Sequence, residues 1–368
     1  MKMHNALAVS VSIAALLASS FSASAQSMNE LAAAATAEGQ LTVIALPHTW
    51  CGYGAVIEAF KAKYPGITVN ELNPDAGSAD ELEAIRANKG NTGPQAPDVI
   101  DVGLSFGPAA KEEGLLQAYK VSTWEEIPAD AKDADGFWYG DYYGVLAFGI
   151  NKTVLTADSP KTWADLSKPE YANSVAFAGD PRTSNNAIMS VYAAGLSTGA
   201  DAAGAAAAGL DFFKKLNDAG NFVPVDAEAS VLAQGTATIV MNWDYNLLSM
   251  RDGFAGNPEM DIVVPSDGVV AGVYIQAISA FAPHPNAAKL WMEYLYSDEG
   301  QLGWLAGYCH PIRFNALAAA GKVPQDLLDK LPAAENYAKA VFPSLAEQDA
   351  AKKQIAAEWD TTVGANVQ

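Results

Sequence analysis

The sequence predicts an α/β protein with two domains, each built on a mainly parallel sheet flanked by helices. Short apolar runs of strand length alternate with segments whose apolar residues recur at helical spacing, which is typical of strand-helix-strand units. About 340 residues follow the N-terminal leader described below, more than one ordinary hydrophobic core organises, so two domains are expected. Hydrophobic residues make up 50% of the chain and aromatic residues 10%, a composition that excludes intrinsic disorder.

The first 25 residues have the pattern of a secretory signal peptide. Lys2 precedes an apolar run over residues 6–21, and Ala23-Ser24-Ala25 supplies the small residues of a cleavage site before Gln26. A membrane anchor is the alternative, but the run is short and contains serine, and no cysteine follows it for lipid attachment. We therefore expect an exported, soluble chain in the periplasm.

The chain is strongly acidic, with 42 Asp and Glu residues against 22 Lys and Arg, a formal charge of −20. Loss of Lys2 with the leader takes this charge from −20 to −21. Such a charge argues against nucleic acid or an anionic membrane surface as a partner. It also means that a site for an anion has to be formed by local donors.

The first third of the mature chain predicts a strand over 41–46, a helix over 55–64 and a strand over 67–72. Parallel strands joined in this way need a right-handed crossover, and such sheets bind ligands at the carboxyl ends of their strands. Trp50 lies in the loop after the first strand, so we interpret it as a ligand contact. Burial of its ring in the core is the alternative.

Two serines follow the next strands at the same edge of the predicted sheet. Ser78 comes after the second strand, and Ser105 after a third strand over 98–102, so both are candidate ligand contacts. Ordinary turn chemistry explains Ser78 equally well. The other elements predicted are helices over 80–89, 108–113, 186–196, 201–219, 231–235, 287–296 and 298–306, further helices beyond Pro324, and strands over 144–151, 175–177, 237–241, 261–265 and 269–281.

The loop Asp180-Pro-Arg-Thr-Ser184 joins a predicted strand to a predicted helix. Thr183 and Ser184 are good N-cap residues, and a helix start presents free N–H groups and a positive dipole end. Arg182 adds a planar donor fork that matches a carboxylate or phosphate. We interpret this loop as an anion site; a capped loop with a solvated arginine is the alternative.

The two cysteines of the chain are Cys51 and Cys309. In an exported chain an even number favours a disulfide, with two buried free thiols as the alternative. His48 and His310 lie near the cysteines in sequence, so a Cys-His nucleophile is a further alternative, but no other motif supports one. The sequence also lacks a Gly-x-Ser-x-Gly elbow and a His-Glu-x-x-His metal pair, so we expect neither an enzyme nor a cofactor or metal site.

The order of these signals resembles that of the periplasmic solute-binding proteins of ABC transporters, in the branch that holds polyamine, ferric iron, thiamine and sugar-phosphate binders. The resemblance covers nearly the whole mature chain and rests on the order of its motifs rather than on one of them. The matching stretches are the first strand with its Trp50 loop, 96–101, 140–151, 160–166 with Pro181, 275–283, 285–289, 297–301 and 307–313.

The resemblance implies two lobes joined by crossing strands, with one ligand enclosed between them by hinge closure. Lobe 1 is expected over 27–146 and 271–325, and lobe 2 over 147–270 and 326–368. The implied function is binding of a small polar solute for an ABC permease in the inner membrane, by a monomer. A chemosensory receptor shares the same fold, and an exported enzyme is the competing class.

Several residues correspond to ligand contacts of that family. Trp50 matches an aromatic that stacks on ligand in polyamine-binding proteins, and Trp243 with Asp244 matches their aromatic and carboxylate at an ammonium group. The spacing of this pair is tighter here, and a strand-end Asp that caps a turn is the alternative for Asp244. The candidate set comprises Trp50, Ser78, Ser105, Arg182, Thr183, Ser184, Trp243, Asp244, Tyr245 and Tyr274.

Arg182 on one side and Asp244 with indoles on the other predict a zwitterion, such as γ-aminobutyrate, an aminophosphonate or an opine-like compound. A sugar phosphate and a polyamine are the alternatives. Ferric iron is a further one because Tyr142 and Tyr143 are adjacent, although they precede the crossing strand instead of lying in lobe 2.

Overall fold

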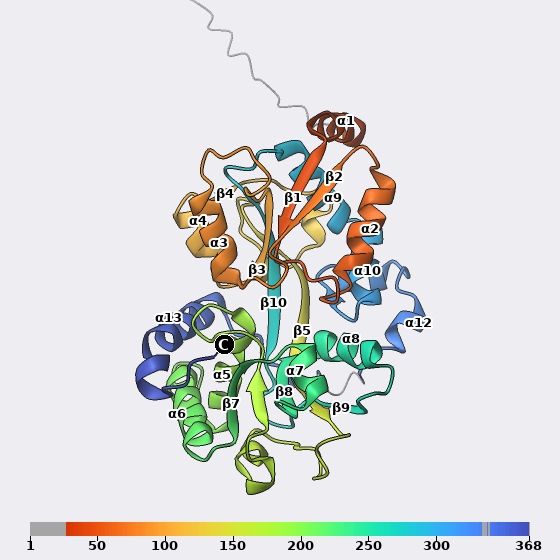
Figure 1. Cartoon of the computed structure of the whole chain (residues 1–368). Coiled ribbons are helices and arrows are strands. Elements are labelled where there is room, and N and C mark those ends of the chain that lie inside the picture. The colour runs from red at the N-terminus through yellow and green to blue at the C-terminus, as the bar shows by residue number, and fades with distance from the viewer. Residues whose placement is uncertain (1–26, 333–336, 338, 368) are drawn as a thin grey trace, which may run out of the picture.

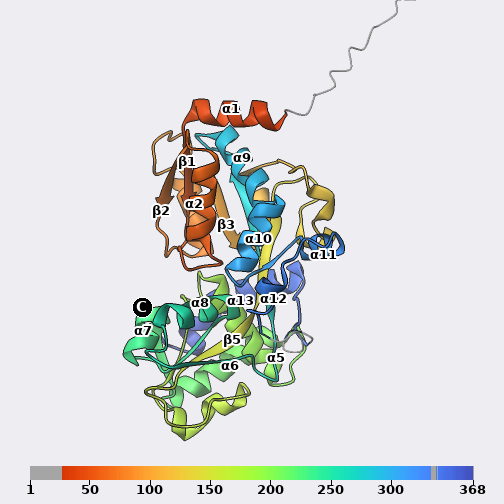
Figure 2. The ribbon, with the colours of Figure 1, turned by 90° about the vertical axis from the view of Figure 1, so that its right-hand side faces the viewer.

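The computed structural model describes residues 27–332, 337 and 339–367, so the predicted signal peptide lies outside the described residues. Figure 1 shows two lobes, one above the other, with strands β5 (Tyr139–Asn151) and β10 (Ala271–Ser279) running between them. We call the upper part lobe 1 and the lower part lobe 2. The turned view in Figure 2 shows the same separation.

Lobe 1 begins with a strand-helix-strand unit, as predicted. Strands β1 (Gln40–Ile44) and β2 (Thr68–Leu72) pair in parallel, and helix α2 (Tyr53–Lys63) joins them. The chain next to β3 (Val99–Gly103) borders β1, because the Asp98 N–H donates to the Thr42 carbonyl (2.8 Å). The carboxyl ends of these strands meet at the lower edge of the lobe, which faces lobe 2.

The main sheet is mixed, which corrects the expectation of mainly parallel pairing. Its strands follow the order β3-β10-β5-β8-β6-β7, with β6 (Val175–Phe177), β7 (Phe222–Asp226) and β8 (Ile239–Trp243) in lobe 2. The pairs β6–β7 and β6–β8 are parallel, whereas β10 pairs antiparallel with both β3 and β5, and β5 with β8. The cause is the crossing: β5 runs from lobe 1 to lobe 2 and β10 returns, so each opposes its neighbours.

Helices α5 (Asn185–Ser197) and α6 (Ala205–Asp218) cover one face of the lobe 2 sheet. The two helices approach very closely at Gly195 and Gly209, which have no side chain. A Cβ atom on Gly195 would lie 1.8 Å from the Ala205 carbonyl oxygen, and one on Gly209 would lie 1.9 Å from the Val191 carbonyl oxygen. Helix α13 (Leu345–Thr362) packs on both, after the chain has crossed between the lobes for the third time. Its Trp359 lies against Phe177 of β6.

The predicted helices and strands occur, with ends shifted by a few residues, and some elements were not predicted. Helix α8 (Asp244–Phe254) follows β8 directly, where only a strand-end loop was expected. The remaining elements are α1 (Met28–Glu38), α3 (Ser78–Ala87), α4 (Phe106–Glu112), α7 (Ala229–Gln234), α9 (Pro285–Leu295), α10 (Asp298–Ala306), α11 (Phe314–Ala319), α12 (Gln325–Leu328), β4 (Leu116–Gln117), β9 (Met260–Val263), β11 (His310–Pro311) and short 3-10 turns.

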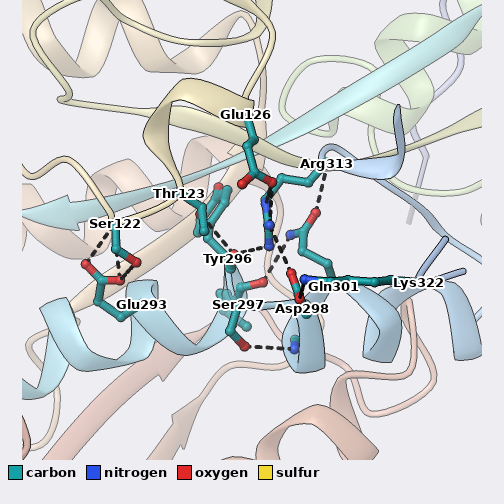
Figure 3. A network of polar contacts seen from close by, with 12 residues as sticks. Ser122, Thr123, Glu126, Glu293, Tyr296, Ser297, Asp298, Gln301, Arg313 and Lys322 are labelled. Atoms are coloured by element: carbon teal, nitrogen blue, oxygen red, sulfur yellow. Dashed lines mark hydrogen bonds and ion pairs between the residues drawn. The ribbon is translucent and has the colours of Figure 1, made fainter. Parts of the chain in front are cut away.

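A buried arginine fixes the end of lobe 1 beside the crossing strand (Figure 3). Arg313 Nη1 donates to the Tyr296 carbonyl (2.6 Å), and its guanidinium pairs with Glu126 and with Asp298 of α10. The Arg313 backbone N–H donates to Gln301 Oε1 (2.9 Å). The arginine side chain is only 4% exposed, and these bonds tie the chain after β11, which itself pairs with β5, to α10 and to the turn at Glu126.

None of the helices in the described part of the chain combines the length and apolar character needed to span a bilayer.

Candidate functional site

A cleft of about 690 Å³ lies between the two lobes. Its lobe 1 wall comes from the loops after β1 and β2, the start of α3 and the end of β3. Its lobe 2 wall comes from the loops after β6 and β7, the first turn of α5, and α8. The cleft therefore lies at the carboxyl ends of the strands of both lobes, where α/β sheets bind ligands.

Trp50 lines this cleft, as the sequence predicted. Its indole Nε1 donates to the Tyr142 hydroxyl (2.6 Å), and its ring meets Tyr274 edge-on with centroids 5.3 Å apart. It also contacts Tyr245 of α8 in the same manner, with centroids 5.5 Å apart. The ring is half-buried, so it presents an aromatic surface to the cleft while its Nε1 atom is hydrogen-bonded to Tyr142.

The disulfide predicted for Cys51 and Cys309 is confirmed. It ties the Trp50 loop to the chain after α10, 258 residues away. Gly307 belongs to the same contact, because a Cβ atom there would lie 2.2 Å from the Cys51 carbonyl carbon. The loop that carries Trp50 is thus fixed by a covalent bond and by close backbone packing.

Thr183 and Ser184 line the cleft from lobe 2. The turn before them needs Gly179, which has φ +83° and whose Cβ would lie 2.3 Å from Ser184 Cβ. Ser184 is the N-cap residue of α5, although its hydroxyl makes no capping hydrogen bond. The first turn of α5, whose backbone N–H groups have no partner within the helix, therefore forms part of the cleft wall.

Arg182 is not placed in the cleft wall. Its guanidinium donates to both oxygens of Asp180 (2.8 and 2.6 Å), to Asp360 (3.0 Å) and to Asn366 (3.1 Å). The arginine thus joins the strand-end loop to the C-terminal segment within lobe 2. Its interpretation as a free donor fork for an anion is not what the structure shows, because aspartates already occupy the fork.

Trp243 and Asp244 are fully buried behind the cleft wall instead of lining it. Asp244 Oδ1 accepts from the Val145 N–H of β5 (3.0 Å), and Oδ2 accepts from the Tyr337 hydroxyl (2.7 Å). Burial raises the pKa of Asp244 to about 6, against these hydrogen bonds, which lower it. Both carboxylate oxygens accept hydrogen bonds from the segments that cross between the lobes, so in the structure Asp244 ties these segments together.

The other predicted contacts divide in the same way. Ser78 and Tyr274 line the cleft, whereas Ser105 and Tyr245 are buried outside its wall. The Ser78 hydroxyl accepts from the Gly103 N–H (3.1 Å) and so fixes the end of β3. The Tyr274 hydroxyl accepts from Trp243 Nε1 (3.3 Å), and its ring stacks on Tyr142.

The carboxylates at the rim of the cleft were missed from the sequence. Asp75 of lobe 1 and Glu228 of lobe 2 are exposed there, and Asp226 lies half-buried between them. Burial and then the neighbouring carboxylates, Asp75 among them, raise the pKa of Asp226 and Glu228, while the Gly179 N–H (2.7 Å) holds Asp226 and lowers its pKa. The three carboxylates lie at or after the ends of β2 and β7. The rule that α/β sheets bind ligands at the carboxyl ends of their strands could therefore have identified them from the sequence.

Asp101 forms the floor of the cleft together with Tyr274. Its Oδ2 accepts from the hydroxyls of Tyr53 and Tyr142 (2.7 Å for the latter), and its N–H donates to the buried Glu81 (2.8 Å). Burial raises the pKa of Asp101 to about 7, against the two tyrosine hydrogen bonds, which lower it. Burial and the nearby Asp101 charge raise the pKa of Glu81 far above its ordinary value.

The charge of the lining is one-sided. It includes seven carboxyl residues, Asp75, Asp80, Glu81, Asp101, Asp180, Asp226 and Glu228, and among the described residues of the wall there is no lysine, arginine or histidine. Asp180 is neutralised by Arg182, and Asp80 caps α3 through the Gly77 N–H (3.0 Å). The rim carboxylates Asp75, Asp226 and Glu228 have no basic partner within the described chain.

The two lobes touch each other beside the cleft through two contacts. Lys352 of α13 donates to the Ser105 carbonyl (2.8 Å) and lies 4.3 Å from the centre of the Phe106 ring. On the other side the Tyr308 hydroxyl donates to Asp252 of α8. Both contacts join lobe 1 to lobe 2. Within residues 27–332, 337 and 339–367, no three His, Cys, Asp or Glu side chains are grouped to hold a metal ion.

The profile of the bacterial extracellular solute-binding protein family matches residues 95–338, about two thirds of the chain. The chain belongs to this family. The resemblance stated from the sequence is thereby confirmed, and the two-lobe α/β fold agrees with it. The family is one of extracellular and periplasmic proteins that bind small solutes.

Three similar proteins illustrate the range of this solute-binding family. A probable ABC transporter periplasmic-binding protein of Sinorhizobium fredii is 28% identical over 272 residues, 71% of each chain. The spermidine/putrescine-binding periplasmic protein of Escherichia coli is 25% identical over 226 residues, 59% of this chain and 64% of that protein. The fructose-6-phosphate complex of the periplasmic binding protein AfuA from Actinobacillus pleuropneumoniae has a TM-score of 0.69 at 20% identity, covering 89% and 99% of the two chains.

Proposed function

We propose that this protein binds a small cationic amine in its inter-lobe cleft and delivers it to an ABC permease. The observation that carries the proposal is the lining, which holds seven carboxyl residues and, in its described part, no basic side chain. Three rim carboxylates, from both lobes, face the same space. An ammonium group between them relieves their mutual repulsion and contacts both lobes, so it binds the closed conformation better than the open one.

The zwitterionic solute expected from the sequence has less support than an amine. Its anionic end was assigned to Arg182, which is paired with Asp180 and Asp360, and its ammonium to Asp244, which is buried behind the wall. The rim carboxylates repel a carboxylate or a sugar phosphate in this cleft. The first turn of α5 is the donor group that would attract such an anion against this repulsion. For ferric iron, Tyr142 is already bonded to Trp50 and Asp101.

The site of action that we propose is the periplasm. The signal-peptide pattern over residues 1–25 and the periplasmic relatives support it. The name of the E. coli relative specifies spermidine and putrescine, two cationic amines, which agrees with the acidic lining. Closure on the solute creates the surface that a permease distinguishes from the open form.

A thermal-shift screen of the mature protein tests the proposal. We expect primary amines without an acidic group to raise the unfolding midpoint, and solutes that carry an anionic group, namely γ-aminobutyrate, fructose 6-phosphate and dicarboxylates, to raise it less or not at all. The double variant Asp226→Asn/Glu228→Gln should lose the response to amines. Glu58→Gln, which removes an exposed carboxylate of α2 outside the cleft, is the matched control and should keep it. A rise with the anionic solutes and none with amines would contradict the proposal.

A further inference from the structure

Three buried side-chain oxygens that line the cleft have no hydrogen-bond partner among the described residues. They are Asp101 Oδ1, Asn185 Oδ1 and Asn186 Oδ1. The three residues are 5%, 2% and 2% exposed, so bulk water does not solvate these atoms freely. A buried acceptor without a partner costs roughly 1–3 kcal/mol, and such groups are rare in folded proteins. The three oxygens line the same cleft, so a bound solute could supply the hydrogen-bond donors that the described residues do not.

The rest of each side chain is held in place. Asp101 Oδ2 accepts from Tyr142 (2.7 Å) and Tyr53, and Asn186 Nδ2 donates to Asn242 Oδ1 (2.6 Å), which fixes the orientation of its amide. Asn185 lies against the end of β3, because a Cβ atom on Gly103 would lie 2.2 Å from its Cγ. Asp101 is in lobe 1 and the asparagines begin α5 in lobe 2, so the three residues line the same cleft from opposite lobes.

We propose that Asp101, Asn185 and Asn186 form a second ammonium subsite at the floor of the cleft, so that the preferred solute is a linear amine with a cationic group at each end. This inference rests on the proposed function and deepens it, because the rim carboxylates supply the first ammonium site. A primary ammonium carries three N–H donors and no acceptor, which suits a set of three acceptors. Asp101 supplies the opposite charge, and the wall offers no basic group that would compete.

The two subsites recognise different parts of the solute. The rim selects any amine by charge, whereas the floor distinguishes what stands at the other end of the chain. A hydroxyl at that end offers one donor and no charge, and it leaves two of the three oxygens without a partner. Sites built to bond a polar group reject analogues that lack it by large factors, because the buried protein groups then go unpaired.

The test compares 1,4-diaminobutane with 4-amino-1-butanol, which differ only at one end, by isothermal titration calorimetry. We expect the diamine to bind at least about tenfold more tightly to the native protein. In Asn185→Ala and in Asp101→Asn this ratio should fall below about threefold, mainly through the loss of diamine affinity. Glu228→Gln should weaken both ligands by a similar factor and keep the ratio, because it changes only the rim.

Equal affinities of the two ligands for the native protein would overturn the second subsite and leave the proposed binding of amines intact. A tenfold preference that neither floor variant reduces would also overturn it. Failure of both ligands to bind would instead contradict the proposed function, and the floor subsite with it. Asn185→Ala carries the test if Asp101→Asn does not fold, since it leaves the hydrogen bonds of Asp101 with Tyr53 and Tyr142 unchanged.

Discussion

The contact between Gly103 and Asn185 shows how one residue sets the approach of the lobes. Gly103 ends β3 in lobe 1, and Asn185 begins α5 in lobe 2. The atoms nearest to a Cβ on Gly103 all belong to Asn185, at 2.2 to 2.6 Å. Such distances do not occur between real atoms, so any side chain here forces the lobes apart or displaces a buried amide.

Gly103→Ala is therefore expected to impair closure without unfolding lobe 1. The clash exists only in the closed conformation, so the affinity for the solute should fall by about tenfold or more. Small-angle X-ray scattering of the saturated variant should give a larger radius of gyration than the native complex. Adding Asn185→Ala removes the clashing atoms and should restore the compact form. An undiminished affinity in Gly103→Ala would contradict this account of the contact.

For single residues, the sequence predicted which side chains lie at the cleft better than it predicted what they contact. Trp50, Ser78, Thr183, Ser184 and Tyr274 line the cleft because they follow strands or lie on the crossing strand, and topology alone brings those points together. Arg182 and Asp244 have hydrogen-bond partners in the structure that the sequence does not reveal. Asp360 lies 178 residues from Arg182, and Tyr337 lies 93 residues from Asp244.

Helix α13 links the lobes on one side of the cleft. Its Lys352 is largely buried, donates to the Ser105 carbonyl and lies over the Phe106 ring of lobe 1. Burial lowers the pKa of Lys352, and Asp349 on the same helix opposes that shift. A hydrogen bond from a charged group and a cation–π contact each contribute about 1 kcal/mol, so this helix stabilises the closed form.

Lys352→Met should weaken solute binding by about fivefold, because it removes a lobe–lobe contact that the open form lacks. Calorimetric titration with the diamine measures the change. Lys353→Met is the matched control: the next residue is exposed, and among the described residues its ion pair is with Asp349 of its own helix, so its loss should leave the affinity nearly unchanged. Equal effects of the two substitutions on affinity would contradict a role of Lys352 in holding the two lobes together.

Most elements were predictable from the sequence, and the exceptions have physical causes. Helix α8 follows β8 without a loop, so the strand pattern of 237–241 concealed its start at Asp244. The sheet was expected to be mainly parallel because strand-helix-strand units predict parallel pairing. The long crossing strands that pair antiparallel in both lobes are a property of the whole chain that local periodicity does not report.

For the whole molecule, the buried carboxyl groups predict how stability depends on pH. Burial raises the pKa of Asp101 to about 7 and that of Asp244 to about 6, well above the value near 3.9 of an unfolded chain. Between these values the native state binds more protons than the unfolded state, so stability rises as the pH falls. His310 acts in the opposite sense below about pH 6.5, because burial lowers its pKa to about 4.

Burial also raises the pKa of Glu81 and Asp141, so the buried carboxyl groups outweigh the histidine. The free energy of unfolding should therefore increase by at least about 1 kcal/mol from pH 7.5 to pH 5.5. Urea denaturation of the solute-free protein at the two pH values measures it. Asp244→Asn keeps an acceptor for Val145 and should be more stable than the native protein at pH 7.5, with a smaller change between the two values. A native protein that loses stability over this interval would contradict the assignment.

The central claim is that the cleft binds a cationic solute, and calorimetric titration with an isosteric pair tests it most directly. 1,4-Diaminobutane and γ-aminobutyrate have similar lengths and differ in replacing an ammonium by a carboxylate. At pH 7.4 we expect one-to-one binding of the diamine, tighter than that of the amino acid by about a hundredfold or more. Tighter binding of γ-aminobutyrate would contradict the account and restore the zwitterion that the sequence alone suggested.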